Sequence, residues 1–378
     1  MVKDFLYLDY SATTKPDEKV ISCFNELVEN QFANPNSSHS IGVAAKEVVE
    51  KAILNISDFL NVAPDEIIFT SGASEANNLA IKGITLNSQR KQIITTGLEH
   101  SSIFGPFGYL QKMGYQIDFV NLTTDGLVDI KHLKSLLSDE TLLVSIGAVD
   151  SEIGIRQPIE EIGLLLKGDP DLYFHSDITQ CLGKVPIDLT HVDLASFSGH
   201  KIYCFKGIGG LVKKKNMKLS PLIHGGKSTT VFRSGTPPTE LIGALSESFN
   251  LFKTTLEKNV AYVERLNQKL RERLATYPNV FMNSTTHSIP HILNLSIMGA
   301  PAAHIQKYFE THNVFISTKA ACASSEDLSR SILTITKDPL RASSAVRISL
   351  SHKTDEQALE RFVQLFNDYM EAIKHETN

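Results

Sequence analysis

The sequence is poor in residues that build metal sites and disulfide frameworks. Its 378 residues include no tryptophan and only four cysteines, and the cysteines are scattered, with no Cys-x-x-Cys pair. Such spacing argues against a disulfide framework or a zinc site, so each thiol has to be judged by itself. We therefore expect no bound metal.

Long apolar runs and an excess of basic charge are also missing. No segment offers about eighteen uninterrupted apolar residues, and the short apolar run at the N-terminus contains an acidic residue and no cleavage-site pattern. Lys and Arg number 37 against 42 Asp and Glu, so nothing points to nucleic acid. These absences predict a cytoplasmic protein with no membrane partner and no direct nucleic-acid partner.

The chain does contain an ordinary globular composition, with 42% hydrophobic and 21% charged residues. A length of 378 residues favours two domains over one. Between residues 17 and 250 the apolar pattern alternates between helical and strand periods, which predicts a mostly parallel sheet covered on both faces. The expected strands lie at 67–70, 93–96, 117–120 and 142–149, and one expected helix at 159–167.

The pattern changes after residue 243. Apolar residues at helical spacing predict one long charged helix over 243–277. Beyond it we expect strands at 292–297, 314–317 and 346–350 and helices at 302–312 and 355–373. The predicted fold class is α/β, with a large domain of residues 16–250 and a smaller α+β domain of residues 1–15 and 251–378 that carries Cys322.

Two β-runs that end in reactive side chains carry the strongest chemical signal. The run 173–177 ends in Asp177, and the run 193–198 is followed by His200 and Lys201. Pyridoxal-phosphate chemistry needs such a pair, because a lysine forms the Schiff base and a carboxylate at the pyridine nitrogen keeps the ring an electron sink. Most lysines are solvated surface residues, but the two features together favour a site for this cofactor.

The stretch 71–78, Ser-Gly-Ala-Ser-Glu-Ala-Asn-Asn, follows a predicted strand and opens a helix. Small residues let the backbone approach an anion, and a helix N-terminus offers free N–H groups and a favourable dipole. The alternative interpretation is an ordinary N-cap by Ser71 or Ser74. Beside a candidate cofactor lysine, a phosphate site is favoured, with Ser198 and His200 as further donors.

Three other residues have two interpretations each. His100 is either an imidazole stacked on the cofactor ring or a surface histidine. Cys322 follows a predicted strand among small and polar residues, where Lys319 would favour the thiolate, whereas the usual alternative is a buried structural cysteine. Arg347 interrupts a β-run and either holds a substrate carboxylate with its planar fork or forms a structural ion pair. Cys204 receives no role.

Taken in order, these motifs resemble the cysteine desulfurases of the NifS/IscS kind, which belong to the class V aminotransferases of pyridoxal-phosphate fold type I. The resemblance covers nearly the whole chain, and the motifs keep their order and spacing. They include Asn34-Pro35-Asn36-Ser37-Ser38-His39, Glu99-His100, His175-Ser176-Asp177, Ser198-Gly199-His200-Lys201 and Arg233-Ser234-Gly235-Thr236.

The resemblance implies pyridoxal 5′-phosphate as cofactor and a role for each matching residue. Lys201 would carry the cofactor and act in catalysis, Asp177 would face its pyridine nitrogen, and His100 would stack on its ring. Gln180 would contact its phenolic oxygen. The phosphate would be held by Ala73, Ser74, Ser198 and His200.

The resemblance also implies a substrate and partners. Thr236 would reach the phosphate from the neighbouring subunit, which makes the protein a homodimer. Arg347, helped by Asn34, would bind the carboxylate of L-cysteine, and Cys322 would take the sulfur as a persulfide while L-alanine leaves. An acceptor protein would then receive the sulfur for iron–sulfur cluster assembly or for thiolation of tRNA or a cofactor.

Several positions depart from the family pattern. The usual Asn-Asn-Glu is Asp150-Ser151-Glu152 here, and the usual Gly-Ser-Ala-Cys is Lys319-Ala320-Ala321-Cys322. The usual Gly-Pro-Lys-Gly is Cys204-Phe205-Lys206-Gly207. These departures leave two alternatives: another class V activity, such as a selenocysteine lyase or an aminotransferase, or a degenerate cofactor-binding scaffold. Cys322 favours desulfuration, since transamination needs no such nucleophile.

Overall fold

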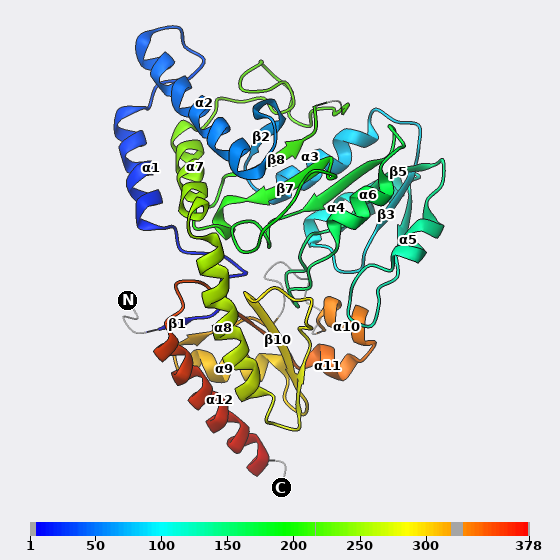
Figure 1. Cartoon of the computed structure of the whole chain (residues 1–378), viewed down its shortest axis with the longest axis vertical. Helices are drawn as coiled ribbons and strands as arrows, with labels where there is room; N and C mark the ends of the chain where they lie inside the picture. The colour runs from blue at the N-terminus through cyan, green and yellow to red at the C-terminus, as the bar shows by residue number, and fades with distance from the viewer. Residues whose placement is uncertain (1–4, 216, 319–327, 377–378) are drawn as a thin grey trace.

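A seven-stranded sheet organises the larger part of the chain in the computed structural model, which describes residues 5–215, 217–318 and 328–376 (Figure 1). Its strands are β2 (Ile67–Thr70), β3 (Gln92–Thr95), β4 (Gln116–Phe119), β5 (Thr141–Ser145), β6 (Tyr173–Asp177), β7 (Leu194–Ser198) and β8 (Gly209–Lys213). They lie in the order β2-β8-β7-β6-β5-β3-β4, and only β8 runs antiparallel to its neighbours. The predicted mostly parallel α/β sheet is confirmed.

Helices between the strands cover this sheet. The strands β2, β3, β5, β7 and β8 are buried at every position, as expected for strands packed between two helical layers. Helix α7 packs against α1 and α2 at one side of the sheet (Figure 1). The helices of this part are α1 (Glu18–Asn30), α2 (Ser40–Leu60), α3 (Ala73–Thr85), α4 (Ser101–Lys112), α5 (Ile130–Leu136), α6 (Ile159–Leu166) and α7 (Thr239–Lys253), with short 3-10 helices η1 (Pro64–Glu66) and η2 (Gly199–Lys201).

The remaining chain builds a smaller antiparallel sheet with helices beside it. Its order is β12-β10-β9, and a separate parallel pair joins β1, near the N-terminus, to β11. The strands are β1 (Leu6–Tyr7), β9 (Val280–Met282), β10 (Ile292–Ile297), β11 (Val314–Phe315) and β12 (Ala345–Ser349). The helices are α8 (Leu256–Leu274), α9 (Ala302–Thr311), α10 (Arg330–Thr336), α11 (Pro339–Ser343) and α12 (Glu356–Glu376).

Two predicted elements differ from the structure. The single helix expected over 243–277 is two helices, α7 and α8, which are interrupted at Thr254 and Thr255. The Thr255 hydroxyl donates to the Leu251 carbonyl, which closes the last turn of α7 by a side-chain bond. The strand expected over 142–149 ends at Ser145, because the Gly147 N–H turns to the Glu99 carboxylate instead of a neighbouring strand.

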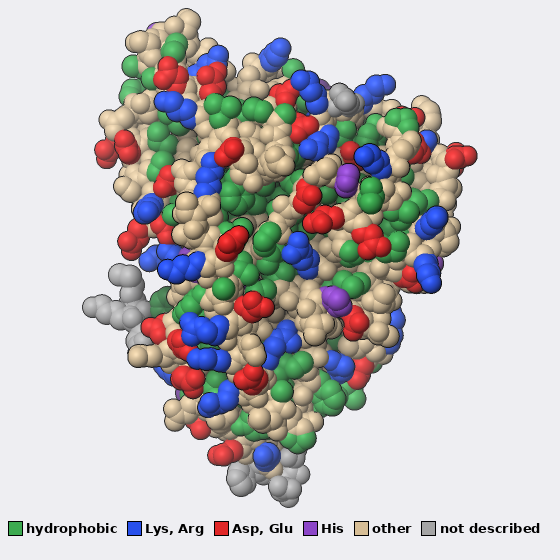
Figure 2. Space-filling model, viewed as in Figure 1, with side chains coloured by type: hydrophobic (Ala, Val, Ile, Leu, Met, Phe, Trp, Pro, Cys, Tyr) green, Lys and Arg blue, Asp and Glu red, His purple; other side chains and the backbone are tan. Residues whose placement is uncertain are grey.

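The apolar core falls into several clusters. One gathers Leu6 and Leu8 with residues between 263 and 370, and the largest gathers residues between 20 and 292 around the seven-stranded sheet. The predicted domain boundary at residues 250 and 251 stays a prediction. Within the described residues no helix is both long and apolar enough to cross a membrane. On the face drawn in Figure 2, acidic and basic side chains are interspersed rather than gathered by sign.

Candidate active site

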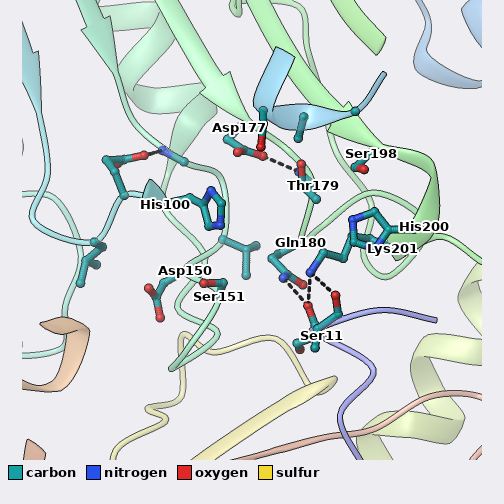
Figure 3. Close-up of a pocket in the computed structure, with 18 of the residues that line it drawn as sticks. Ser11, His100, Asp150, Ser151, Asp177, Thr179, Gln180, Ser198, His200 and Lys201 are labelled. Carbon is teal, nitrogen blue, oxygen red and sulfur yellow. Dashed lines mark hydrogen bonds between the residues drawn. The ribbon is translucent and has the colours of Figure 1, made fainter. Parts of the chain in front are cut away.

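A cavity of about 330 Å³ opens at the ends of the strands of the large sheet. Most of its lining comes from the last residues of β6 and β7 and from segments that follow β2, β3, β5, β6 and β7 (Figure 3). The rest comes from Lys206 and Gly207 before β8 and from Ser11, Ala12 and Arg347. Strands β5, β6 and β7 are parallel neighbours, so their carboxyl ends meet at one edge of the sheet. This edge is where ligands bind in open α/β folds. Of the residues singled out in the sequence, the cavity brings together Ala73, Ser74, His100, Asp177, Gln180, Ser198, His200, Lys201 and Arg347.

Asp177, the last residue of β6, is held in one orientation by two donors. Asn77 Nδ2 lies 2.8 Å from Asp177 Oδ2, and the Thr179 N–H lies 2.9 Å from Asp177 Oδ1. Asn77 comes from α3 and is fully buried. The carboxylate therefore faces the cavity on a rigid support.

Lys201 follows β7 in the short helix η2 and directs its amine to the N-terminal segment of the chain. Its Nζ donates to the carbonyl oxygens of Ser11, at 2.5 Å, and Ala12, at 2.7 Å. Gln180 Nε2 donates to the same Ser11 carbonyl at 3.0 Å. Lys201 and Gln180 thus meet at one backbone oxygen, as Figure 3 shows.

The start of α3 fits an anion. Its N-cap is Gly72, with φ of 149°, and no side chain caps the helix, so the predicted alternative of a cap by Ser71 or Ser74 is wrong. A side chain at this φ would be strained, and its Cβ would lie 3.4 Å from Ser198 Oγ. The first N–H groups of a helix have no partner within it, so this end offers free donors and a positive dipole to the cavity.

Two histidines at the cavity are neutral near neutral pH. Burial, strengthened by the charge of Lys201, lowers the pKa of His200 to about 4. Burial also lowers the pKa of His100, whose Nδ1 accepts the Ser102 N–H at 3.1 Å, so the neutral ring carries its proton on Nε2. His100 lines the cavity and is not exposed, which rules out the surface interpretation.

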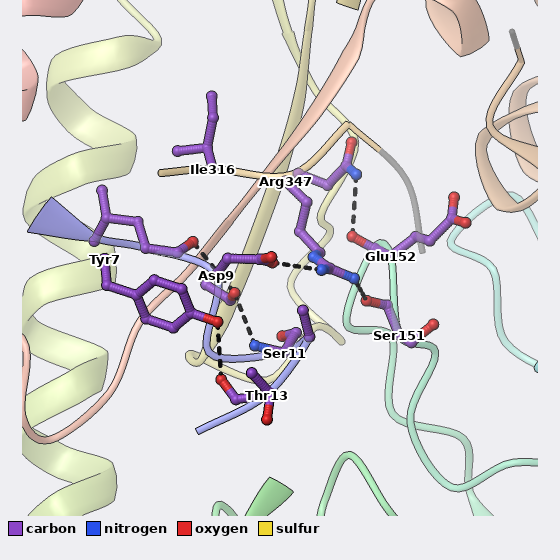
Figure 4. A network of polar contacts seen from close by, with 12 residues as sticks. Tyr7, Asp9, Ser11, Thr13, Ser151, Glu152, Ile316 and Arg347 are labelled. Carbon is purple, nitrogen blue, oxygen red and sulfur yellow. Dashed lines mark hydrogen bonds and ion pairs between the residues drawn. The ribbon is translucent and has the colours of Figure 1, made fainter. Parts of the chain in front are cut away.

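Arg347 is 1% exposed and lines the cavity, and its polar contacts are drawn in Figure 4. Its Nη2 pairs with Asp9 Oδ1 at 2.6 Å, and its Nη1 donates to the Ser151 carbonyl at 2.8 Å. Its Nε has no hydrogen-bond partner among the described residues. Arg347 therefore forms the structural ion pair and also lines the cavity, and its role toward a substrate carboxylate stays a prediction.

Sequence reasoning missed two buried acids at this site. Glu99 accepts from Gly147 N–H and Thr96 Oγ1, and burial raises the pKa of its carboxyl to about 8. Asp150 accepts from Ser331 Oγ at 2.9 Å, and burial raises the pKa of its carboxyl to about 6. The signal for Glu99 was its place between a strand and His100. For Asp150, only the departure from the family pattern marked the position.

Several expected residues do not line the cavity. Asn34 and Thr236 are absent from its wall in the single chain, and Cys322 lies outside the described residues, so their roles stay predictions. Cys204, to which no role was given, is buried, and burial raises the pKa of its thiol to about 12. A thiol of that pKa is inert near neutral pH, which fits a structural cysteine.

Comparison with known proteins identifies the family to which this chain is similar. The family model "Aminotransferase class-V" matches residues 6–362. A curated relative, the cysteine desulfurase IscS of Rickettsia bellii, is 36% identical over 95% of this chain and 90% of its own length. A solved NifS-like protein superposes with a TM-score of 0.92 at 29% identity, over 97% of this chain and 100% of that one. A structure of SspA in complex with cysteine gives a TM-score of 0.82 at 29% identity, over 93% and 100% of the two chains.

Proposed function

The chain belongs to the class V aminotransferase family and, within it, to the cysteine desulfurases, and from this premise we propose that it moves sulfur from L-cysteine onto Cys322 and then to an acceptor protein. It is a pyridoxal-phosphate-dependent enzyme. The observation that carries the proposal is the convergence of Lys201, Asp177 and Arg347 on one cavity. These are the groups that such an enzyme needs for the cofactor and for the carboxylate of an amino acid.

The residues of the cavity fit pyridoxal 5′-phosphate. The uncapped start of α3, together with Ser74, Ser198 and neutral His200, suits the phosphate, and Asp177 suits the protonated pyridine nitrogen. One donor in the lining, Thr179 Oγ1, is buried without a partner among the described residues, as expected where a ligand completes the bonding. When bound, the cofactor supplies an electron sink for the pair released at the substrate Cα.

Three side chains would then handle the substrate. The Arg347 guanidinium, fixed by Asp9 and with Nε unused, binds the carboxylate of L-cysteine. Lys201, which lines the cavity, removes the proton from Cα with its Nζ. His100, neutral and with its proton on Nε2, serves as a donor next to the reacting atoms.

Sulfur transfer needs one further group, and we assign it to Cys322. The Cys322 thiolate attacks the substrate sulfur, an S–S bond forms, and the Cβ–S bond breaks with its electron pair left on carbon. Cβ takes a proton and the product leaves as L-alanine. One L-cysteine and one thiol thus give one L-alanine and one persulfide, with no outside oxidant or reductant.

A homodimer and a sulfur acceptor complete the proposal. Exposed apolar side chains occur in two segments: Phe32 and Ile41 lie between the end of α1 and the first turn of α2, and Ile223 and Val231 lie between β8 and α7. An Asn36–Ser228 hydrogen bond of 3.1 Å joins these two segments, and we infer that a second copy covers them and brings Thr236 to the neighbouring cavity. Light scattering on the purified protein distinguishes dimer from monomer.

The acceptor, the compartment and the domain boundary are also part of the proposal. We place the enzyme in the cytoplasm, and the three cysteines of the described residues, all free thiols, suit a reducing compartment. The acceptor would be a cluster scaffold or a thiolation enzyme for tRNA or a cofactor. Residues 16–250 would form the large domain and residues 1–15 and 251–378 the smaller one, which limited proteolysis tests.

Mass spectrometry of the loaded protein tests the sulfur transfer. After L-cysteine is added without reductant, the peptide that contains Cys322 should gain the mass of one sulfur atom. Peptides with Cys23, Cys181 and Cys204 serve as internal controls and should stay unmodified, since burial raises the pKa of all three thiols. Sulfur on any of these three and none on Cys322 would contradict the proposal.

A further inference from the structure

A second buried lysine lies directly behind the cavity. Lys184 is 5% exposed, does not line the cavity, and donates from Nζ to Gln180 Oε1 at 2.8 Å. Within the described residues it has no salt bridge to an acid. A buried lysine without a carboxylate partner carries a desolvation cost that its packing alone does not offset.

The charged surroundings of Lys184 make its position more unusual. Burial, together with the nearby cations Lys201 and Arg347, lowers its pKa to about 7, while the Cys181 thiol acts in the opposite direction. Another titratable neighbour, His291, is buried and uncharged near neutral pH, because burial and then Lys184 lower its pKa to about 3. The Lys184 amine thus lies where burial and neighbouring cations disfavour its positive charge, and its hydrogen bond goes to Gln180 Oε1.

That hydrogen bond fixes which end of the Gln180 side chain faces the cavity. Lys184 Nζ donates to Gln180 Oε1 in the structure, and whenever the amine is protonated the opposite orientation is excluded, because an ammonium group only donates. Nε2 then points the other way, where it donates to the Ser11 carbonyl at 3.0 Å and lines the cavity beside Lys201. An amide carries two N–H bonds, so the second remains available to a ligand.

We propose that Lys184 is a positioning residue, which holds the Gln180 carboxamide so that it presents an N–H donor, rather than a carbonyl acceptor, to the phenolic oxygen of the cofactor. The inference rests on the proposed function, because it assigns Gln180 to that oxygen. A donor there spreads the negative charge of the oxygen and weakens its hold on the proton of the lysine-linked nitrogen. Lys184 therefore acts through Gln180 on the protonation of Lys201.

A pH titration of the cofactor's visible absorbance in the holoenzyme tests whether Lys184 acts on the cofactor through Gln180. Lys184→Met leaves Gln180 Oε1 without its donor, and the pKa of the absorbance change should rise by up to about one unit. Gln180→Leu should shift the same pKa upward. The double variant should titrate like Gln180→Leu alone, because the two residues form one unit. Lys184→Arg keeps a donor-only cation and should restore the titration toward that of the wild type.

A matched control distinguishes the effect of the contact between Lys184 and Gln180 from the effect of removing any buried lysine. Lys213 is 4% exposed and donates to the backbone carbonyls of Lys214 and Lys215, away from the cavity. Lys213→Met should leave the titration unchanged.

Two results would overturn the inference: an unchanged titration in Lys184→Met, or a double variant whose shift equals the sum of the two single shifts. A wild-type protein that binds no pyridoxal phosphate would instead refute the proposed function. If Lys184→Met fails to fold, the comparison of Gln180→Leu with Gln180→Glu, which places an acceptor at the same oxygen, decides whether a donor is needed there.

Discussion

The cavity has two walls of different origin. We call the first the sheet wall, formed by the segments that follow β2, β3, β5, β6 and β7, and the second the junction wall, formed by Ser11, Ala12 and Arg347. In the sheet wall, each reactive side chain ends or follows its own strand, as Asp177 ends β6. In the junction wall, Arg347 depends on Asp9, a residue 338 positions away in the sequence. The comparison shows that this site takes its cofactor groups from local sequence order and its substrate group from tertiary packing.

The largest effect is expected when the sheet wall loses charge. Asp177→Asn should lower kcat by about a hundredfold or more, because a neutral amide no longer stabilises a protonated pyridine nitrogen. Asn77 Oδ1 is buried without a partner, so the Asn77 amide can turn to accept from the new side chain and the fold should survive. Steady-state alanine formation measures the loss, and unfolding temperature serves as control. A variant with unchanged kcat would show that Asp177 does not support the cofactor.

A substitution in the support of the junction wall should weaken substrate binding more than it slows turnover. Asp9→Asn removes the anion that orients Arg347, and KM for L-cysteine should rise by about tenfold with a much smaller change in kcat. Lys353→Ala is the matched control, since it removes a more exposed ion pair with Asp17 that lies outside the cavity lining. It should leave KM as it is. A fall in kcat at constant KM for Asp9→Asn would contradict the division between the walls.

Glu99, a buried acid of the sheet wall, should make folding stability depend on pH. Burial raises the pKa of Glu99 from 4.5 to about 8, so between these values the folded protein holds a proton that the unfolded chain has released. Its contribution to the free energy of unfolding therefore falls as pH rises through that window, by at most ~1.4 kcal/mol per pH unit. Glu99→Gln should flatten this dependence in denaturant titrations from pH 5 to 8. An equally steep fall in the variant would show that other groups cause it.

The smallest effect is expected where α10 contacts the sheet wall. Ser331→Ala removes the 2.9 Å hydrogen bond to buried Asp150, and the free energy of unfolding should fall by about 1 kcal/mol at neutral pH. Below the Asp150 pKa of about 6 the carboxyl is protonated, so the loss should shrink. Urea unfolding at pH 7 and pH 5 measures both values. A loss that grows at pH 5 would contradict the assignment of a charged acceptor.

The same contrast explains how much the sequence could predict. Strands β2 and β6 match the expected residues 67–70 and 173–177, because a buried run bounded by polar residues is a local pattern. Asp177 and Lys201 could be found for the same reason, since Asp177 ends β6 and Lys201 lies in the short helix η2 that follows β7. The parallel order of β6 and β7 then brings them to one edge of the sheet.

The rest of the site depends on contacts that no local pattern records. The Ser11 carbonyl accepts from Lys201 only because the N-terminal segment returns across the cavity. The burial that raises the pKa of Asp150 comes from packing, and its bond to Ser331 spans 181 positions. The break between α7 and α8 also escaped prediction, because the apolar spacing continues across Thr254 and Thr255.

The central claim is that the cavity and Cys322 together remove sulfur from L-cysteine. The most direct measurement is single-turnover release of alanine and sulfide from L-cysteine in the presence of a thiol reductant, for the wild type and for Cys322→Ala. We predict equal amounts of alanine and sulfide from the wild type, and neither from the variant, whose cofactor absorbance should stay unchanged. Sulfide from Cys322→Ala at the wild-type level, or no alanine from a wild type that holds its cofactor, would contradict the account.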